Sequence, residues 1–397
     1  MPNHAKEPGI INPFTLQSIK ILWPQIQTPT TRNYGRFAKK SRSIHASFEI
    51  QSNTVVSGNS MNGAHYSNGE PIKITFLRRG IPKGYSNEAP EYPIKPPERI
   101  NIASLPISKE LKNAFWISSL ELDHFGHTLT ETASSLFPLL AWQQAGFDLS
   151  QINVVITENF KNEKSIHLLS TLLPTLTPSK IHIVRKDESI SIKKLFIPHP
   201  TMIIRESVSK GQIWATRAMA KTLTHSSELI NTRQRENIPA NMRESTPVDL
   251  SEQKNTKPAK LWLSRKNISH RRFLEEQKLE QTLISHGWHI FHPEEHSLRA
   301  QLGALKKAKV IAGTMSSSFH LLMALSKKNT SKSVYMLAAN HMQTVTYFEQ
   351  FKQQGFRFTI DNCLEYSMTS NNQLKLRDGR SIEALNASIN SFALSAF

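Results

Sequence analysis

Two histidines and two acidic residues gather in the stretch LDHFGHTLTETASSLFPLLAW, residues 122–142. His127 and Glu131 are four residues apart, which places them on the same face of a helix, and Asp123 and His124 come just before them. An imidazole hydrogen-bonded to a carboxylate can act as a general base, because the carboxylate fixes the tautomer and the basicity of the ring. The spacing therefore suits the removal of a proton from a bound substrate.

Two other interpretations of this cluster stay open. A His–Glu pair at helical spacing can simply steady the helix, and that is the simplest interpretation of an isolated pair. His124, His127 and Glu131 could also bind a metal ion, but the surrounding residues lack the HExxH pattern of zinc proteases, so we expect no metal here. The choice depends on the rest of the chain.

Polar and basic residues also follow two strand-like runs in the C-terminal half. LWLSRKNISHRRFLEE and KVIAGTMSSSFHLLMAL each read as a strand, a short polar turn and the start of a helix. Backbone N–H groups at a helix start, the helix dipole and arginine side chains all favour phosphate. The candidate anion-binding residues are Ser264, Arg265, Lys266, Arg271, Arg272, Gly313, Thr314, Ser316, Ser317, Ser318 and His320.

Each of these turns also has a purely structural interpretation. Serines commonly cap helices. The two arginines, placed at the start of the next helix, could pair with Glu275 and Glu276 on a solvated face. Both strands should nevertheless end at the same edge of a parallel sheet, where open α/β sheets bind ligands. Glu294 follows a third strand, WHIFH, at such an edge, where its carboxylate suits a ribose hydroxyl.

The elements that position these residues alternate between strands and helices, which predicts α/β domains with parallel sheets. The expected organisation is an irregular, basic, poorly ordered arm (1–70), an N-terminal domain (71–230), a polar linker (231–259) and a C-terminal domain (260–397). In the N-terminal domain, helices are expected over 125–145 and 161–173, and the first strand over 71–79. In the C-terminal domain, strands are expected over 260–265, 288–292, 309–313 and 333–337, with helices over 270–286, 297–308 and 316–326.

Composition limits the classes of protein to consider. The 397 residues are 38% hydrophobic and 20% charged, enough for two ordinary cores. A net charge of +18 favours anionic partners, which include nucleic acid, phosphorylated small molecules and acidic membrane surfaces. The single cysteine, Cys363, excludes an intrachain disulfide and fits a reducing compartment. No apolar run approaches the roughly 18 residues of a membrane-spanning helix.

Taken in order, the quoted stretches resemble the bacterial branch of glycosyltransferase family 61. The shared features are the GH-x3-E segment, the SRK strand end, the double arginine with acidic residues behind it, the GW strand with its trailing Pro-Glu, and the AKVIAG strand. The resemblance covers residues 115–325. It implies a GT-B architecture, in which two Rossmann-like domains face a cleft and the C-terminal one holds a nucleotide-sugar donor.

The resemblance also assigns the first cluster a role. It implies that His127, Glu131 and Asp123 serve catalysis in the acceptor domain, with the choice of base between His127 and Glu131 left open. The chain departs from the family at Met315 and Ser316, where relatives have glycine in the turn, so close backbone approach to phosphate is in doubt.

We therefore predict a cytoplasmic glycosyltransferase that needs no cofactor or metal. Its expected partners are a nucleotide sugar and a glycan or lipid-linked acceptor in surface polysaccharide synthesis, with peripheral association at an anionic membrane. One alternative is a degenerate transferase fold that only binds. Another is a nucleic-acid-binding protein, which we do not expect, because the basic residues are dispersed and no helix-turn-helix, RRM, KH or zinc-finger pattern is present.

Overall fold

The computed structural model divides into two compact units, Met1–Met219 and Ala220–Phe397. It describes residues 48–58, 64–72, 99–117, 126, 128–157, 162–185, 187–199, 201–203, 207–224, 259–268, 271–326, 331–339, 341–366 and 373–396. Both units are mixed α/β structures with parallel strands, compatible with a Rossmann-like glycosyltransferase fold.

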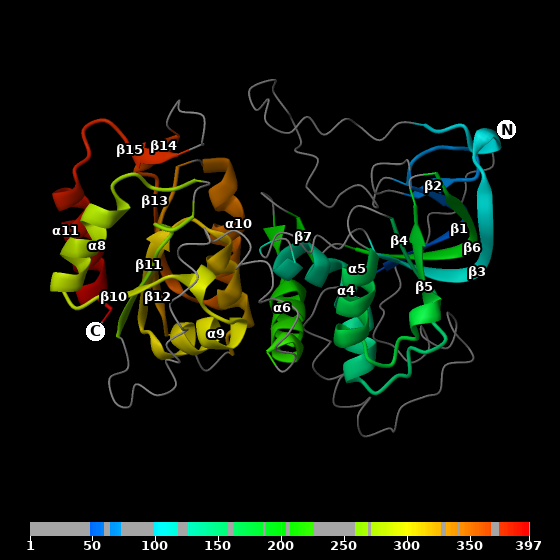
Figure 1. Cartoon of the computed structure of the whole chain (residues 1–397), viewed down its shortest axis with the longest axis horizontal. Helices are drawn as coiled ribbons and strands as arrows, with labels where there is room; N and C mark the ends of the chain where they lie inside the picture. The colour runs from blue at the N-terminus through cyan, green and yellow to red at the C-terminus, as the bar shows by residue number, and fades with distance from the viewer. Residues whose placement is uncertain are drawn as a thin grey trace. The chain divides into compact units, whose positions relative to one another are not determined.

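The first unit contains a six-stranded sheet in the order β2-β1-β6-β3-β4-β5 (Figure 1). Neighbouring strands β6, β3, β4 and β5 run parallel, whereas β1 pairs antiparallel with both β6 and β2. The bounds are β1 (Phe48–Ser57), β2 (Ala64–Tyr66), β3 (Ile107–Ile117), β4 (Val154–Thr157), β5 (Ile181–Val184) and β6 (Ser189–Pro198). The expected parallel sheet is present, with two antiparallel strands added at one edge.

The two edge strands correct the prediction that order begins near residue 71. β1 and β2 fall within residues 1–70, which the composition assigns to an irregular arm. Val55, Val56 and Ala64 are buried in the core of this sheet, and the Thr54 hydroxyl donates to the Ile192 carbonyl oxygen (3.3 Å). β1 owes its place to pairing with β6, more than 130 residues away, which local composition does not reveal. Residues 1–47 and the strand predicted over 71–79, from residue 73 onward, lie outside the described residues.

Three helices accompany this sheet: α4 (Ala133–Gln144), α5 (Asn162–Leu172) and α6 (Lys210–Leu223). A π-helical turn, Thr128–Thr132, leads into α4, which contacts β3 and β6 and is buried from Ala133 to Trp142. The helices predicted over 125–145 and 161–173 are confirmed. Short elements complete the unit: 3₁₀ turns at Ile102–Ser104 and Pro178–Lys180, and the paired strands β7 (Met202–Ile203) and β8 (Ser207–Val208). No described helix is long and apolar enough to cross a membrane.

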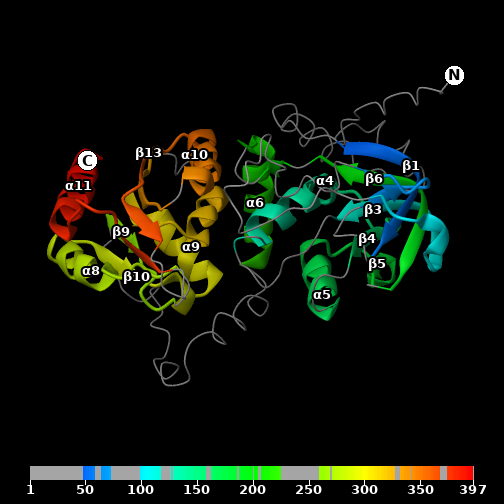
Figure 2. The same ribbon diagram turned by 90° about the horizontal axis from the view of Figure 1, so that it is seen from above.

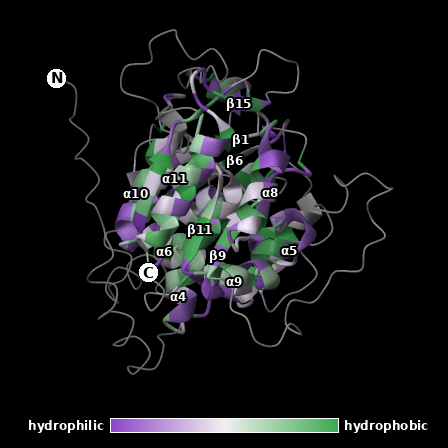
Figure 3. Ribbon diagram, turned by 90° about the vertical axis from the view of Figure 1, so that its left-hand side faces the viewer, coloured by the Kyte–Doolittle hydropathy of each residue, from purple (hydrophilic) through white to green (hydrophobic). Residues whose placement is uncertain are grey.

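The second unit contains a five-stranded sheet in the order β10-β9-β11-β12-β13, and every neighbouring pair is parallel. Its strands are β9 (Lys260–Leu263), β10 (His289–Phe291), β11 (Val310–Thr314), β12 (Ser333–Leu337) and β13 (Arg357–Asp361). β11 and β12 are buried at every position, as expected for strands covered on both faces, and β11 is mainly green in Figure 3. A small antiparallel pair, β14 (Leu364–Tyr366) and β15 (Leu374–Leu376), follows.

Helices cover both faces of this sheet (Figures 1 and 2). α8 (Glu276–Ser285) and α11 (Ile382–Leu394) pack on one face, in a core that includes Trp262, Val310 and Ala312. α9 (Leu298–Lys307), a 3₁₀ helix at Ser317–Ala324 and α10 (His341–Gln354) lie on the other. The predicted C-terminal alternation is therefore confirmed, and the strand predicted over 333–337 coincides with β12.

Two predicted helices differ in detail from the structure. The helix expected over 270–286 begins only at Glu276, because the chain first makes a bridge between Phe273 and Leu374, and Arg271 has a left-handed backbone (φ 55°). The helix expected over 316–326 is a 3₁₀ helix. The predicted linker lies outside the described residues except for Ala259, and the division into units falls at residues 219 and 220, inside α6.

Candidate functional site

The strand order of the second unit defines the place where a ligand is expected. From β9 the chain passes through α8 to β10 on one side, and from β10 it crosses through α9 to β11 on the other side of β9. The order therefore reverses between β9 and β11, and ligands of open α/β sheets bind outside the carboxyl ends of the strands at such a switch point. Leu263 pairs with Gly313 there, so Ser264 and Thr314 follow at the same level.

Arg265 stands at this switch point, two residues after the end of β9. Its backbone N–H donates to Oε1 of Glu276, the first residue of α8, over 3.1 Å. Burial lowers the pKa of Arg265 from its ordinary value, and the negative charges of Glu276 and Glu294 oppose that effect. Because guanidinium groups stay protonated in proteins, the site keeps a fixed positive charge and a fork of N–H donors beside the strand end.

Two glutamates on α8 form a buried acidic pair that the sequence interpretation missed. Glu276 is fully buried and Glu280 is 4% exposed. The pKa of Glu276 is raised to about 8, chiefly by burial and also by the charge of Glu280, while the Arg265 N–H acts in the opposite direction. The expected pairing of Arg271 and Arg272 with Glu275 and Glu276 on a solvated helix face is wrong for Glu276, which turns inward to Arg265.

The basic residues near Arg265 have different surroundings. Lys266 Nζ lies 3.9 Å from Glu280 Oε2, and its backbone N–H donates to the Ser264 hydroxyl (3.1 Å). Arg271 is near enough to Arg265 for its charge to lower the pKa of Arg265. The carbonyl oxygen of Arg272 accepts from the Leu374 N–H (2.8 Å), which ties this residue to β15. The structure thus brings Lys266 and Arg271 to the site, while no described contact links the Arg272 side chain with it.

Gly313 and Thr314 end β11 in a tightly packed arrangement. A Cβ atom on Gly313 would lie 2.6 Å from the Leu263 carbonyl oxygen and 3.0 Å from Leu263 Cβ. Glycine is therefore required for the approach of β11 to β9, independently of any ligand. The Thr314 side chain is fully buried, and its hydroxyl has no hydrogen-bond partner among the described residues.

The serine turn after β11 does not use Ser316 as a side-chain cap. Ser316 occupies the N-cap position of the 3₁₀ helix, yet its hydroxyl makes no capping bond there. Its carbonyl oxygen instead accepts from the Tyr347 hydroxyl of α10 (3.1 Å). Ser317 and Ser318 are half-buried in the first turn of the helix. For Ser316, the capping interpretation is therefore wrong.

His320 is held in one orientation from two directions. The Gln350 amide donates through Nε2 to the Phe319 carbonyl oxygen (2.7 Å), so its Oε1 faces His320 Nδ1 (2.9 Å) and must accept from it. The proton of neutral His320 therefore lies on Nδ1, which leaves Nε2 as the basic nitrogen. The ring also stacks on Tyr347, with centroids 4.6 Å apart and an interplanar angle of 10°.

A further polar group follows β10, next to β9. The Ser264 N–H donates to the Phe291 carbonyl oxygen (2.9 Å), so the ends of these two strands lie side by side. His292, Glu294 and Glu295 come directly after β10, the two glutamates in a 3₁₀ turn (Pro293–Glu295). The pKa of Glu294 is raised to about 7, chiefly by burial and also by the charge of Glu295, while its own backbone N–H and the charge of Arg265 act in the opposite direction. Glu294 therefore belongs to the same electrostatic environment as Arg265.

The first predicted cluster is only partly described. Glu131 is 3% exposed within the π-helical turn before α4, a type of distortion that is frequent at functional sites. The turn is fixed by α6, because Gln212 Nε2 donates to the Thr130 carbonyl oxygen (2.9 Å) and the Thr216 hydroxyl to the Leu129 carbonyl oxygen (2.8 Å). His127 and Asp123, like His124, lie outside the described residues, so their roles stay predictions.

Several residues of the site had no clear signal in the sequence. Tyr347 and Gln350 come from α10, beyond the stretch that carries the motifs, and the inward-facing Glu276 and Glu280 look like ordinary helix surface residues. For the two glutamates, the sequence held one weak indication. Glu276, Leu279, Glu280 and Leu283 have helical spacing, and all four are buried on one face of α8.

A parallel α/β unit with such a switch point belongs to the class of open α/β folds, which bind ligands outside the carboxyl ends of their strands. Residues 125–332, more than half of the chain, match the sequence model of the family described as Glycosyltransferase 61. The chain belongs to glycosyltransferase family 61. No curated protein has significant similarity to it.

Proposed function

We propose that this protein transfers a sugar from a nucleotide-sugar donor to a glycan or lipid-linked acceptor. Family membership supports a glycosyltransferase, and the position of Arg265 at the switch point between β9 and β11 is the observation that carries the donor assignment. The donor diphosphate would lie outside the carboxyl ends of these strands, within reach of Arg265, Lys266 and the N–H groups of the serine turn.

The chemistry of glycosyl transfer fits the charges at this edge. When the bond from the sugar to the diphosphate breaks, negative charge collects on the leaving group and requires cations or N–H donors placed in advance. Arg265 supplies a guanidinium fork, and Ser317 and Ser318 supply hydroxyl donors in the turn where the chain departs from the family's glycine at Met315 and Ser316.

The acceptor hydroxyl must lose its proton during the attack on the anomeric carbon. We assign this step to Glu131 and His127, with Asp123 as a further candidate, because they come from the acceptor half that the family resemblance implies. The supporting observation is that the buried Glu131 sits in a π-helical turn anchored by Gln212 and Thr216. A cleft of GT-B type between the two units is part of this proposal.

The net charge of +18 suits an acceptor that carries a lipid diphosphate at an anionic membrane face. We therefore propose peripheral membrane association in the cytoplasm and a role in surface polysaccharide synthesis.

The second candidate is a transferase fold that binds a nucleotide without transferring sugar. This candidate is favoured by the packing of the turn after β11. Met315 is only 5% exposed there, and the Ser316 carbonyl oxygen already accepts a hydrogen bond from the Tyr347 hydroxyl.

A thermal-shift screen against nucleoside diphosphates and nucleotide sugars tests the proposal, with transfer or hydrolysis of each hit followed by mass spectrometry. A donor at one hundred times its dissociation constant should stabilise the protein by about 2.7 kcal/mol. Turnover of the stabilising nucleotide sugar is the expected result. Stabilisation without turnover would favour the binding protein, and stabilisation only by oligonucleotides would contradict both candidates.

A further inference from the structure

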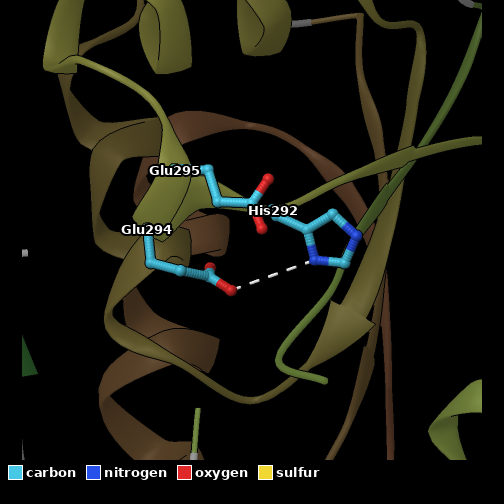
Figure 4. Close-up of side chains that lie close together, drawn as sticks. All are labelled: His292, Glu294 and Glu295. Carbon is cyan, nitrogen blue, oxygen red and sulfur yellow. Dashed lines mark ion pairs between the residues drawn. The ribbon is translucent and has the colours of Figure 1, made fainter. Parts of the chain in front are cut away.

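The side chains at the end of β10 are arranged as ligands around a common point. His292, Glu294 and Glu295 each offer one nitrogen or oxygen atom, and these three atoms lie within 4.8 Å of one another. Figure 4 shows the Glu294 carboxylate directed at the His292 ring, with the Glu295 carboxylate beside it. The distance from His292 Nδ1 to Glu294 Oε1 is 3.9 Å.

That distance is too long for a hydrogen bond, since hydrogen bonds of this type span about 2.7–3.2 Å. Two ligand atoms that each lie about 2.0–2.2 Å from one metal ion are separated by roughly 3.3–3.6 Å at a tetrahedral angle. A small movement of either side chain would therefore bring His292 and Glu294 to the separation of two ligands of one ion.

Glu294 provides an independent indication that a ligand is missing from this point. Its side chain is 10% exposed, and both carboxylate oxygens are buried without a hydrogen-bond partner among the described residues. Nδ1 of His292 is also buried without a hydrogen-bond partner among the described residues. Burying a carboxylate without hydrogen bonds is costly, and natural proteins seldom leave such groups unsatisfied.

The neighbouring charges also leave room for a cation. Four carboxylates, those of Glu276, Glu280, Glu294 and Glu295, share this environment with three cationic groups, those of Arg265, Lys266 and Arg271. The acidic groups therefore outnumber the basic ones.

We propose that His292, Glu294 and Glu295 bind a divalent transition-metal ion at the edge of the sheet. One imidazole nitrogen with carboxylate oxygens suits Mn²⁺ or Zn²⁺, whereas Mg²⁺ and Ca²⁺ prefer oxygen ligands alone. Asn267 already orients Glu295, because Asn267 Nδ2 donates to Glu295 Oε1 (2.7 Å). Oε2 of Glu295 is then left for the ion. This proposal differs from the sequence-based expectation that the protein needs no metal.

The ion would sit next to Arg265, whose charge acts on Glu294. In that place it would add positive charge where the leaving diphosphate collects negative charge, a consequence that rests on the proposed function. Metal binding itself depends only on the three side chains. The two proposals can therefore fail separately.

The test is a titration of the full-length protein, first stripped of metal with a chelator, with Mn²⁺ at pH 7.5. Free Mn²⁺ is followed by electron paramagnetic resonance, and a parallel titration uses Zn²⁺ and calorimetry. We expect one ion per chain, and at least a tenfold loss of affinity in both Glu294→Gln and Glu295→Gln. Because Glu295 is exposed, its variant should fold normally. His289→Gln on the same strand and Glu349→Gln on α10 serve as matched controls and should bind as the wild type does.

Equal Mn²⁺ and Zn²⁺ affinity in the wild type and both glutamine variants would overturn the site, as would no binding of either ion. A nucleotide titration without metal separates the two proposals. If nucleoside diphosphate binds but Mn²⁺ and Zn²⁺ do not, the metal site is wrong and the proposed function stands. If Glu294→Gln weakens nucleotide binding equally with and without Mn²⁺, Glu294 contacts the nucleotide and the metal assignment is wrong.

Discussion

Gly313→Ala separates two reasons for the presence of a glycine at the end of β11. If the residue serves phosphate approach, the substitution should weaken ligand binding and leave the fold intact. The structure supports the other reason, because the new Cβ would lie 2.6 Å from the Leu263 carbonyl oxygen of the neighbouring strand. Loss of stability in the second unit is therefore the expected result.

The magnitude follows from this geometry. Real Cβ atoms essentially never lie closer than 3.0 Å to such a neighbour, so β9 and β11 must separate locally by at least 0.4 Å, the difference between 3.0 and 2.6 Å. Both strands are central, and Val310, Ile311 and Ala312 are fully buried, so nothing nearby can yield easily. Overpacking of this kind typically costs about 1–3 kcal/mol. At about 2–4 °C for each kcal/mol in a domain of this size, a lower melting temperature should be easy to detect.

Differential scanning calorimetry of the full chain measures this effect, with Gly303→Ala as the matched control. Gly303 lies inside α9 and an added Cβ meets nothing within 4 Å, so its replacement should stabilise the helix by about 0.5–1 kcal/mol. A Gly313→Ala protein that melts with the wild type, yet binds nucleotide poorly, would refute the packing argument and restore the ligand-contact interpretation.

Two other predictions concern the first unit. Glu131→Gln should reduce turnover by about 10²- to 10⁴-fold while donor affinity and melting temperature stay close to wild type, and near-normal turnover or a loss explained by melting would make Glu131 a structural residue. Burial lowers the pKa of His182 to about 4, with Lys109 and Lys180 adding to the effect, so the folded state favours the neutral ring. This stabilisation is complete above the unfolded value of 6.5 and is lost as the pH falls from 6.5 towards 4. Urea denaturation across that range should show a steeper loss for the wild type than for His182→Gln, and parallel curves would contradict the assignment.

The switch point of the second unit was predictable because its strands are buried on both faces. Runs such as KVIAG and SVYML are nearly continuous in apolar residues, which is the pattern of a parallel strand covered by helices. The strand ends could therefore be placed within a residue or two. Ser264 follows the end of β9 and Thr314 ends β11, and these two residues lie at the same level on one edge.

Other parts depend on contacts between distant segments, which a local pattern does not contain. β1 is stabilised as a strand by its antiparallel pairing with β6. In the sequence, Glu276 could pair with the nearby arginines on a solvated helix face, whereas tertiary packing turns it towards Arg265. The π-helical turn before α4 and the 3₁₀ helix after β11 differ from α-helices only in their hydrogen-bond spacing, and hydrophobic periodicity does not distinguish them.

Calorimetric titration of the nucleoside diphosphate identified by the screen tests the central claim, that the donor diphosphate binds at Arg265 between β9 and β11. Arg265→Ala should lose about 1.5–3 kcal/mol of binding free energy, which is roughly a ten- to 150-fold rise in Kd. Arg265→Lys keeps the charge beside Glu276 and Glu294 but not the guanidinium fork, so its Kd should lie between those of the wild type and Arg265→Ala. This variant also controls for folding. An unchanged Kd in Arg265→Ala, with the protein still folded, would contradict the claim.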